Sequence, residues 1–340
     1  MASEDGKPTT ISTIMNIAEK AKDFHGVKYL AAGGIAGGVS RTAVAPLERL
    51  KILIQVQPPE NVNYNGTIQG LKYIWRTEGL RGMFKGNGSN CVRIVPNSAV
   101  GFYSYEEVAK GALWLYRQET GNENAQSNSL VRFGAGSCAG AISLTATYPL
   151  DMVQGRLSVQ TDKSSRRYRG IFHALRTVMV EEGPRALYKG WLPSVIGVIP
   201  YLGFNFSVYE SSKEWVLESN PHILLSKNTE SNMAIISLAC GAAAGIVSQT
   251  VTYPLDVIRR RMQIAGWKDA ASVITGDGKG KAPPEYNGMV DAFLKTIRSE
   301  GFGALFKGWM PNAIKMVPCT AVSFVTYELV KDYLGAPPKK

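Results

Sequence analysis

The hexapeptide PLERLK at residues 46–51 recurs as PLDMVQ at 149–154 and as PLDVIR at 254–259. Every copy has a proline with an acidic residue two positions later, and the first and third copies add a basic residue five positions after the proline. The copies lie roughly 100 residues apart, and a pattern that returns at a fixed period marks a repeated structural unit. The sequence therefore predicts a chain of three such units.

Three further motifs follow each copy in a constant order. A segment that opens with Tyr-x-Gly and ends with Glu-Gly spans residues 64–79, 168–183 and 286–301. An aromatic-Lys-Gly motif then lies at 84–86, 188–190 and 306–308, and a Tyr-Glu pair closes the units at 105–106, 209–210 and 327–328. The large departure from this spacing is an insertion between Gln263 and Tyr286, whose Gly, Lys and Pro residues predict a surface loop.

Each unit contains two long, mostly apolar stretches on either side of a short amphipathic one. The first long stretch, from about Tyr29 to Gln57, would extend roughly 40 Å as a helix, which is enough to cross a bilayer. Glycines four residues apart have the spacing that lets membrane helices approach closely, and they occur as the pairs Gly33/Gly37, Gly136/Gly140 and Gly241/Gly245. We therefore expect an all-α membrane protein with six transmembrane helices in three pseudo-symmetric repeats and three short helices on one side.

We expect the repeats to occupy residues 28–115, 128–218 and 232–335. Residues 1–27 are expected to form a polar N-terminal arm with a short amphipathic helix around Ser12–Lys22. The arm has no long apolar run, so it is not a secretory signal, and its acidic residues without any Arg are untypical of a mitochondrial presequence. Because six is an even number of spans, both ends of the chain are expected on one side of the membrane.

The composition argues against an enzyme and against a metalloprotein. The four cysteines are widely spaced and the three histidines lie far apart, so the sequence predicts neither a disulfide framework nor a metal site. No Walker motif and no Ser/His/Asp or Cys/His set occurs, so we expect no catalytic residues and no cofactor. The net charge of +11 lacks the basic runs with interleaved aromatics that are typical of nucleic-acid binding.

Polar and charged side chains lie within the apolar stretches. In the first stretch Arg41, Glu48, Lys51 and Gln55 recur at helical spacing and form one polar stripe. The same stripe recurs in the other repeats at Asp151, Gln154, Asp256, Arg259 and Gln263. A charge at mid-bilayer costs about 2.5–3.5 kcal/mol, so such residues face a cavity or one another. The stripes therefore predict a water-accessible cavity that a ring of ion pairs closes at one end. The alternative, a solvated face of a soluble helical protein, is disfavoured by the glycine spacing and the threefold repetition.

The motif P-x-[DE]-x-x-[KR] followed by [DE]-G-x(4)-aromatic-[KR]-G, three times over residues 28–335, resembles the signature of the mitochondrial carrier family. The resemblance implies a carrier in the mitochondrial inner membrane, with three short helices on the matrix side and both termini towards the intermembrane space. It also implies a monomer that works by alternating access between a matrix gate and a cytoplasmic gate.

Within this family, the segment SRTAVAPLER at 40–49 is similar to adenine nucleotide carriers, as is Gly86-Asn87 leading to Arg93. The resemblance implies antiport of AMP, ADP and ATP. The run RRRMQI at 259–264 departs from the RRRMMM of the ADP/ATP carrier, which disfavours that protein.

Three alternatives to adenine nucleotide antiport remain open at this stage. One is a carrier of coenzyme A or a related nucleotide cofactor. Another is an ATP-magnesium/phosphate-type carrier without calcium regulation, because the N-terminal arm is too short for an EF-hand extension. A proton leak or a scaffold built on the same fold belongs to another class.

The resemblance also implies a set of substrate-contacting residues: Arg93, Gly197, Val198 and Lys315, with Arg41 and Tyr201 as further candidates. Arg93 can bind a phosphate through two hydrogen bonds, and Lys315 supplies a point charge. Gly197 would let adenine approach the backbone, Val198 would pack on its face, and Tyr201 would stack on the base or hydrogen-bond with it. Ordinary helix packing is the alternative role for Gly197 and Val198.

The implied matrix gate pairs Glu48 with residue 154, Asp151 with Arg259 and Asp256 with Lys51, and Gln55 and Gln263 brace it. Here the sequence departs from the family pattern. Residue 154 is Gln154, which carries no charge, and Ser158 replaces the third glutamine. We therefore expect two ion pairs in the matrix gate.

The implied cytoplasmic gate pairs Glu106 with Lys213 and Glu210 with Lys331, braced by Tyr105, Tyr209 and Tyr327. Glu328 would face Ala109, which cannot pair, so two ion pairs are expected here as well.

The expected partners are anionic. The basic net charge fits anionic substrates and anionic lipids such as cardiolipin. The glycines that begin the short helices, Gly66, Gly170 and Gly288, could offer backbone N–H groups to lipid phosphates. No nucleic-acid partner is expected.

Overall fold

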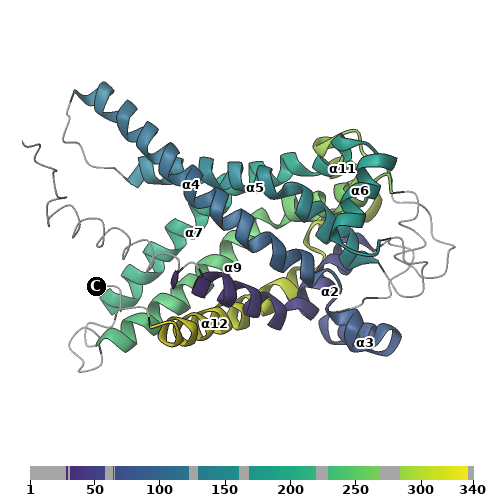
Figure 1. The fold of residues 1–340 in the computed structure, drawn as a ribbon, viewed down its shortest axis with the longest axis horizontal. Coiled ribbons are helices and arrows are strands. Elements are labelled where there is room, and N and C mark those ends of the chain that lie inside the picture. The colour runs from purple at the N-terminus through teal and green to yellow at the C-terminus, as the bar shows by residue number, and fades with distance from the viewer. Residues whose placement is uncertain are drawn as a thin grey trace, which may run out of the picture.

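Figure 1 shows the computed structural model of the chain as a ribbon. The structure describes residues 28–29, 31–57, 64, 66–121, 129–160, 168–219, 229–267 and 284–335. The N-terminal arm, with its helix expected around Ser12–Lys22, and residues 268–283 of the insertion lie outside the described residues.

Each repeat contains two long helices and a short helix between them. In repeat 1, helical residues 31–43 pass through a turn at Val44 into α2 (Ala45–Val56), and the second long helix is α4 (Asn87–Thr120). The long helices of the other repeats are α5 (Ser129–Val159), α7 (Trp191–Ser219), α9 (Thr229–Ile264) and α12 (Trp309–Tyr333). The short helices are α3 (Thr67–Met83), α6 (Ile171–Glu181) and α11 (Met289–Glu300), and 3-10 segments η1 (Pro184–Tyr188) and η2 (Phe302–Phe306) follow α6 and α11. The described residues contain no β-strand, and the predicted all-α architecture is confirmed.

Prolines interrupt the backbone hydrogen bonding of the long helices. A proline has no N–H to donate and its ring clashes with the preceding turn, so it permits a kink. The signature prolines are Pro46 at the start of α2, Pro149 within α5 and Pro254 within α9. The second helix of each repeat carries its own proline, at Pro96, Pro200 and Pro318.

Glycines let the two long helices of each repeat approach one another. A side-chain carbon added at these glycines would lie 3.5 Å from Ile94 for Gly37, 3.2 Å from Val198 for Gly140, and 2.8 Å from Met316 for Gly245. These are the second members of the predicted glycine pairs, whereas the first members, Gly33, Gly136 and Gly241, have no such neighbour within 4 Å. The expected close packing is therefore confirmed at one glycine of each pair.

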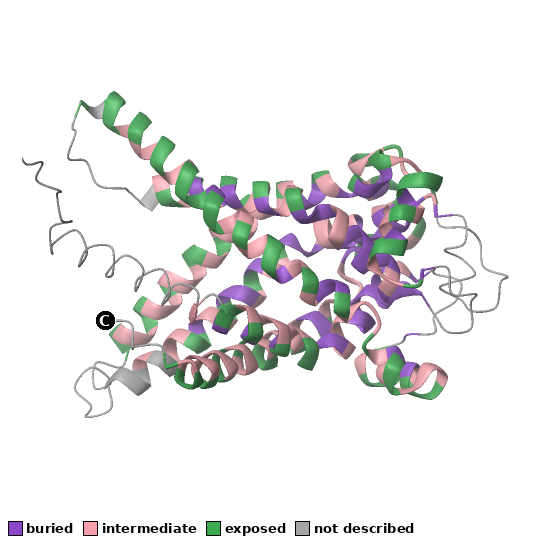
Figure 2. Ribbon diagram, viewed as in Figure 1, coloured by how far each residue is buried: buried purple, intermediate pink, exposed green. Residues whose placement is uncertain are grey.

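Buried residues concentrate at the end of the molecule that carries α6 and α11, which we call the short-helix end (Figure 2). The core there includes Leu50, Ile74 and Val178. It also includes Trp267, which lies in the insertion that was expected to form a surface loop. Trp267 is only 1% exposed and its ring lies 5.5 Å from that of Tyr168, so the prediction is wrong for the start of the insertion. An indole buries much apolar surface, which outweighs the turn-forming residues that follow it.

Among the described residues, three helical segments are long and apolar enough to cross a membrane: Pro184–Ser219, Ile236–Ile264 and Phe302–Tyr333. The other long helices carry polar and charged residues along their length. Large apolar side chains remain exposed, among them Phe102, Phe206 and Leu329. An apolar exterior with charged residues inside is the arrangement expected of helices in lipid.

Candidate functional site

Three arginines that the sequence analysis missed join the repeats at the short-helix end. Each donates from its Nε to a backbone carbonyl of the next repeat: Arg49 to Ser158 at 2.9 Å, Arg156 to Gln263 at 3.2 Å, and Arg261 to Gln55 at 3.2 Å. These three bonds close a ring, because repeat 1 contacts repeat 2, repeat 2 contacts repeat 3, and repeat 3 contacts repeat 1.

The same arginines each bind the glutamate of the Glu-Gly motif in their own repeat. Their partners are Glu78, Glu182 and Glu300, and the Nη2 contacts measure 2.9 Å in all three cases. Burial alone would raise the pKa of Glu182, but the hydrogen bond and charge of Arg156 hold that pKa below its usual value. The pKa of Glu300 is lowered in the same way by Arg261 and Lys307, against the effect of burial.

The sequence does contain a signal for these arginines, but their spacing from the signature proline is not constant. Arg156 and Arg261 each lie seven residues after the signature proline, whereas Arg49 lies only three residues after Pro46. Arg49 therefore occupies the same helix face one turn earlier, so a search at constant spacing does not find it.

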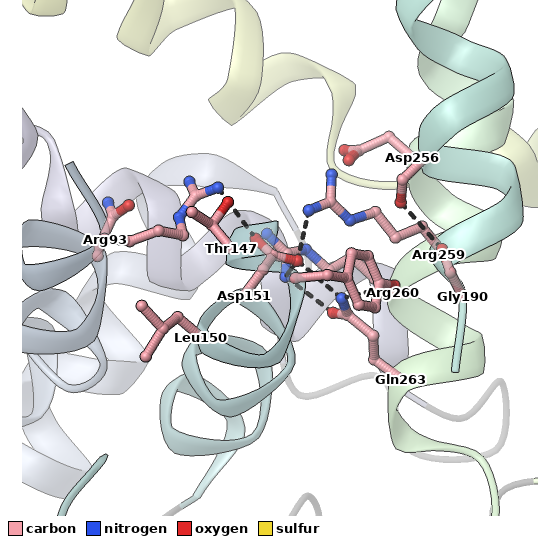
Figure 3. Close-up of polar contacts among 12 residues, drawn as sticks. Arg93, Thr147, Leu150, Asp151, Gly190, Asp256, Arg259, Arg260 and Gln263 are labelled. Atoms are coloured by element: carbon pink, nitrogen blue, oxygen red, sulfur yellow. Dashed lines mark hydrogen bonds and ion pairs between the residues drawn. The ribbon is translucent and has the colours of Figure 1, made fainter. Parts of the chain in front are cut away.

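Two of the expected matrix-gate ion pairs are present in the structure. Lys51 lies 2.7 Å from Asp256, and Arg259 pairs with Asp151 (Figure 3). The expected glutamines touch the same carboxylates: Gln55 Nε2 donates to Asp256 at 3.2 Å, and Gln263 Nε2 donates to Asp151 at 2.8 Å. Each pair therefore joins two different repeats and has a neutral brace beside it.

Two buried tyrosines complete these links and were not predicted. The hydroxyl of Tyr148 accepts from Gln263 at 3.2 Å and donates to the Lys189 carbonyl at 2.9 Å. Tyr253 does the same between Gln55 at 3.1 Å and the Lys307 carbonyl at 3.0 Å. Both tyrosines directly precede a signature proline, and Ala45 stands at that position in repeat 1. This tyrosine–proline pair is the signal that sequence reasoning overlooked.

The third link differs from the expected pairing. Glu48 pairs with Lys315 of α12, and not with Gln154. Gln154 is buried, and its Oε1 has no hydrogen-bond partner among the described residues. The physical reason is that an uncharged amide cannot neutralise a buried carboxylate, whereas the ammonium of Lys315 can. Ser158, in the place of the third glutamine, donates to the carbonyl of Gln154 at 2.8 Å instead.

Two of the three cations that were assigned to the substrate contact acids of the matrix gate. Arg93 Nη1 lies 3.6 Å from Asp151 Oδ1, and Lys315 binds Glu48. Arg41 donates to Asn90 at 2.8 Å, and its charge acts on Arg93. Arg93, Gly197 and Lys315 each lie three residues before the proline of their helix, so they occupy equivalent positions in the three repeats.

The residues assigned to adenine lie on α7. Val198 packs against Gly140 as Ile94 and Met316 pack against their own glycines, which favours helix packing over contact with a base. A carbon added at Gly197 would lie 3.7 Å from Leu255. Tyr201 lies within electrostatic reach of Lys315, so the tyrosine and the candidate phosphate site are neighbours.

The expected cytoplasmic-gate pairs are not formed. Lys331 lies 2.6 Å from Glu328 of its own helix, not beside Glu210, and the ammonium of Lys213 lies over the ring of Tyr209, 5.7 Å from its centroid. Glu106 has no ion-pair contact with Lys213, and the side chains of Tyr105 and Tyr327 form no hydrogen bond across helices among the described residues. The reason is that α4 diverges from α7 and α12 at the end opposite the short helices, which is therefore the open end (Figure 1).

Basic side chains outnumber the acids of the matrix gate. These acids are Glu48, Asp151 and Asp256, and the bases near them are Lys51, Arg93, Arg259, Arg260 and Lys315. Such a surplus of buried positive charge can accept an anionic ligand. No group of His, Cys, Asp and Glu that could hold a metal ion occurs in the part of the chain that the structure describes.

Comparison with known proteins agrees with this geometry. The family model described as "Mitochondrial carrier protein" matches residues 22–113, 125–220 and 230–337. The chain is 62% identical to the mitochondrial adenine nucleotide transporter ADNT1 of Arabidopsis thaliana over 98% of both chains. It is 36% identical to the mitochondrial carrier protein CoAc1 of Zea mays, over 100% of this chain and 97% of the relative. It is also 36% identical to the mitochondrial adenyl nucleotide antiporter SLC25A24-A of Xenopus laevis, over 93% of this chain and 60% of that one. The chain belongs to the mitochondrial carrier family.

Proposed function

We propose that the protein exchanges adenine nucleotides (AMP, ADP and ATP) across the mitochondrial inner membrane by alternating-access antiport. The identity to ADNT1 over nearly the whole of both chains supports this substrate class. On this proposal the short-helix end faces the matrix, and both termini face the intermembrane space. The protein works as a monomer, because the site lies within one chain, and it is not an enzyme.

The observation that carries the proposal is the position of Lys315 and Arg93. Each is a cation on the second long helix of its repeat, and each contacts an acid of the matrix gate. Lys315 contacts Glu48, and Arg93 contacts Asp151. A nucleotide phosphate is a stronger attraction for these cations than a single carboxylate, because it carries more charge and more acceptor oxygens. Substrate binding therefore competes directly with the contacts that hold the matrix side closed.

This competition couples substrate binding to the opening of the matrix side. When a phosphate takes Lys315 and Arg93, Glu48 loses its ion-pair partner and Asp151 loses one of its cations. A ligand shifts a conformational equilibrium only by binding the two states differently, and these contacts supply such a difference. The matrix ring then opens, and Glu106, Glu210, Lys213 and Lys331 form the cytoplasmic gate that the present state lacks.

The adenine moiety is proposed to lie along α7. Gly197 leaves the backbone open to the base, and Tyr201 offers an aromatic face close to the phosphate-binding lysine. Arg41 is proposed as a third cation for the longer phosphate chains of ADP and ATP.

A coenzyme A carrier is the second candidate, because CoAc1 of Zea mays is similar over the whole chain. Coenzyme A contains an adenine nucleotide, so the same cations would bind it. An ATP-magnesium/phosphate-type carrier without calcium regulation is a third possibility on the same site.

Transport by purified protein in liposomes tests the proposal. The liposomes are preloaded in parallel with AMP, ADP, ATP, coenzyme A or nothing, and uptake of labelled ATP is measured. We expect uptake driven by internal AMP, ADP or ATP and none into empty liposomes. Uptake driven mainly by coenzyme A would favour the second candidate, and uptake into empty liposomes would contradict antiport.

Two variants sharpen this assay. Lys315→Gln is expected to raise the half-saturating nucleotide concentration by about tenfold or more, because a charge-assisted contact to phosphate is lost. Lys295→Gln removes the same charge from the exposed face of α11 and is expected to leave transport unchanged.

Cardiolipin is proposed as a lipid partner. Gly66 and Thr67 at the start of α3 line a pocket together with Gly308 and Trp309 at the start of α12, where backbone N–H groups could bind a lipid phosphate. Transport in liposomes with and without cardiolipin tests this, and equal rates would contradict it.

A further inference from the structure

The matrix gate lacks a basic residue in repeat 2, at the position where repeats 1 and 3 each have one. The equivalent positions, five residues after each signature proline, are Lys51, Gln154 and Arg259. Lys51 and Arg259 each bind an acid of another repeat, whereas the buried Oε1 of Gln154 has no hydrogen-bond partner among the described residues. Glu48 therefore depends on Lys315, which the proposed substrate also needs.

A basic residue without a counterpart in the other repeats lies beside this gap. Arg260 follows Arg259, and Ile52 and Gly155 stand at the equivalent positions of the other repeats. Arg260 is only 5% exposed. Its Nη1 donates to Gln263 at 2.9 Å and lies 3.5 Å from Asp151 (Figure 3). Its Nε has no hydrogen-bond partner in the part of the chain that the structure describes.

The facing helix leaves room for this guanidinium. A side-chain carbon at Gly155 would lie 3.3 Å from Arg260 Nη1 and 2.8 Å from Gln263 Oε1. Gly155 thus leaves space for the guanidinium of Arg260 beside Asp151. A basic side chain at 154 would bring a second positive charge into the same space.

The charge of Arg260 reaches all three acids of the ring. It acts on Asp151, and more weakly than Lys51 it also acts on Glu48 and Asp256. Asp151 already pairs with Arg259, so burying a second arginine beside it is costly and needs an explanation in the transport cycle.

We propose that Arg260 supplies the third positive charge of the matrix gate, in place of the basic residue missing at position 154. While Lys315 is bound to Glu48, Arg260 is in surplus. When a substrate phosphate draws Arg93 away from Asp151, Arg260 stays within 3.5 Å of that carboxylate, so the gate keeps a third positive charge during the transition. This inference rests on the proposed function, and it makes Arg260 a positioning residue that acts on the rate of exchange.

Relocating the charge tests the inference. Exchange is measured in liposomes for the wild type, Arg260→Gln, Gln154→Arg and the double variant. Arg260→Gln is expected to lower the maximal exchange rate about tenfold with little change in the half-saturating nucleotide concentration, since a buried charge contact is lost in the transition. Gln154→Arg alone is also expected to slow exchange, because two cations then share one space. The double variant is expected to recover most of the wild-type rate.

Two controls separate charge from folding. Arg260→Lys keeps the charge and is expected to exchange faster than Arg260→Gln. Arg298→Gln removes an exposed positive charge from α11 and is expected to behave as wild type. A wild-type rate for Arg260→Gln, or a double variant no faster than Arg260→Gln, would overturn the inference.

A second readout does not depend on the substrate. If the wild type exchanges none of the nucleotides, the proposed function fails, and thermal unfolding of the purified proteins in detergent then tests the charge relocation by itself. Gln154→Arg is expected to melt below the wild type, and the double variant above Gln154→Arg, because coupled residues give non-additive effects. Equal melting temperatures for these two variants would refute the proposed relation between positions 154 and 260.

Discussion

Replacing Gly190 by alanine tests how closely the start of α7 must approach α9. A side-chain carbon at Gly190 would lie 2.8 Å from the carbonyl oxygen of Arg259 and 3.0 Å from the hydroxyl of Tyr148. Both atoms belong to residues of the matrix gate or its braces. The carbonyl of Arg259 is a backbone group, so it cannot rotate away as a side chain can. The variant must therefore move α7 away from α9 or disturb the Arg259–Asp151 pair.

Two costs add up at this position. Gly190 has a φ of +81°, which costs an alanine about 1–2 kcal/mol. Overpacking against the two neighbouring atoms adds about 1–3 kcal/mol. The chain offers a control in Gly121, which has a left-handed conformation with a φ of +63° and no atom within 4 Å of the added carbon. Gly121→Ala therefore carries the first cost alone.

The assay is thermal unfolding of both purified variants in detergent, followed by nucleotide exchange in liposomes. Gly190→Ala is expected to melt several degrees below Gly121→Ala and to exchange more slowly. If the two variants melt at the same temperature, the close approach between α7 and α9 does not stabilise the closed ring, and the reasoning is wrong.

Three further results are expected. Trp267→Ala should cost about 3–5 kcal/mol of stability because a buried indole is lost, whereas Trp75→Ala at an exposed position should leave the melting temperature nearly unchanged. The pKa of Glu182 is lowered in the folded protein, so its ion pair with Arg156 stabilises the fold at pH values above the unfolded pKa of 4.5. This stability is lost as the pH falls through the lower folded pKa. Between pH 7 and acid pH, the melting temperature should therefore fall less for Glu182→Gln than for the wild type. Tyr148→Phe should lower the melting temperature by an amount equivalent to about 1 kcal/mol, since the Lys189 carbonyl loses its donor, and a larger loss than Trp267→Ala gives would contradict the hydrogen-bond account.

The fold could be predicted from the sequence because its signals are local and repeated. The copies of the proline motif, the glycine spacing and the polar stripe all act within one helix or one repeat. The ion pairs Lys51–Asp256 and Arg259–Asp151 follow from equivalent positions on equivalent helices, so the symmetry predicts them without coordinates.

The sequence did not predict the contacts that break the symmetry. Arg49 performs the role of Arg156 from one turn earlier on its helix, and Glu48 takes its cation from a second helix because residue 154 is neutral. Trp267 is buried although it begins a stretch rich in turn-forming residues. The cytoplasmic gate depends on which state the carrier occupies, and a single sequence does not specify a state.

The central claim is that the substrate takes Lys315 away from Glu48. A double-mutant cycle with Glu48→Gln, Lys315→Gln and the double variant tests it, with thermal unfolding measured in the absence of nucleotide and at saturating ADP. Without nucleotide, the two residues should show a coupling of about 0.5–3 kcal/mol, as contacting residues do. With ADP bound, the account predicts that this coupling falls close to zero, because the phosphate has replaced the carboxylate. A coupling that is the same with and without ADP would contradict it.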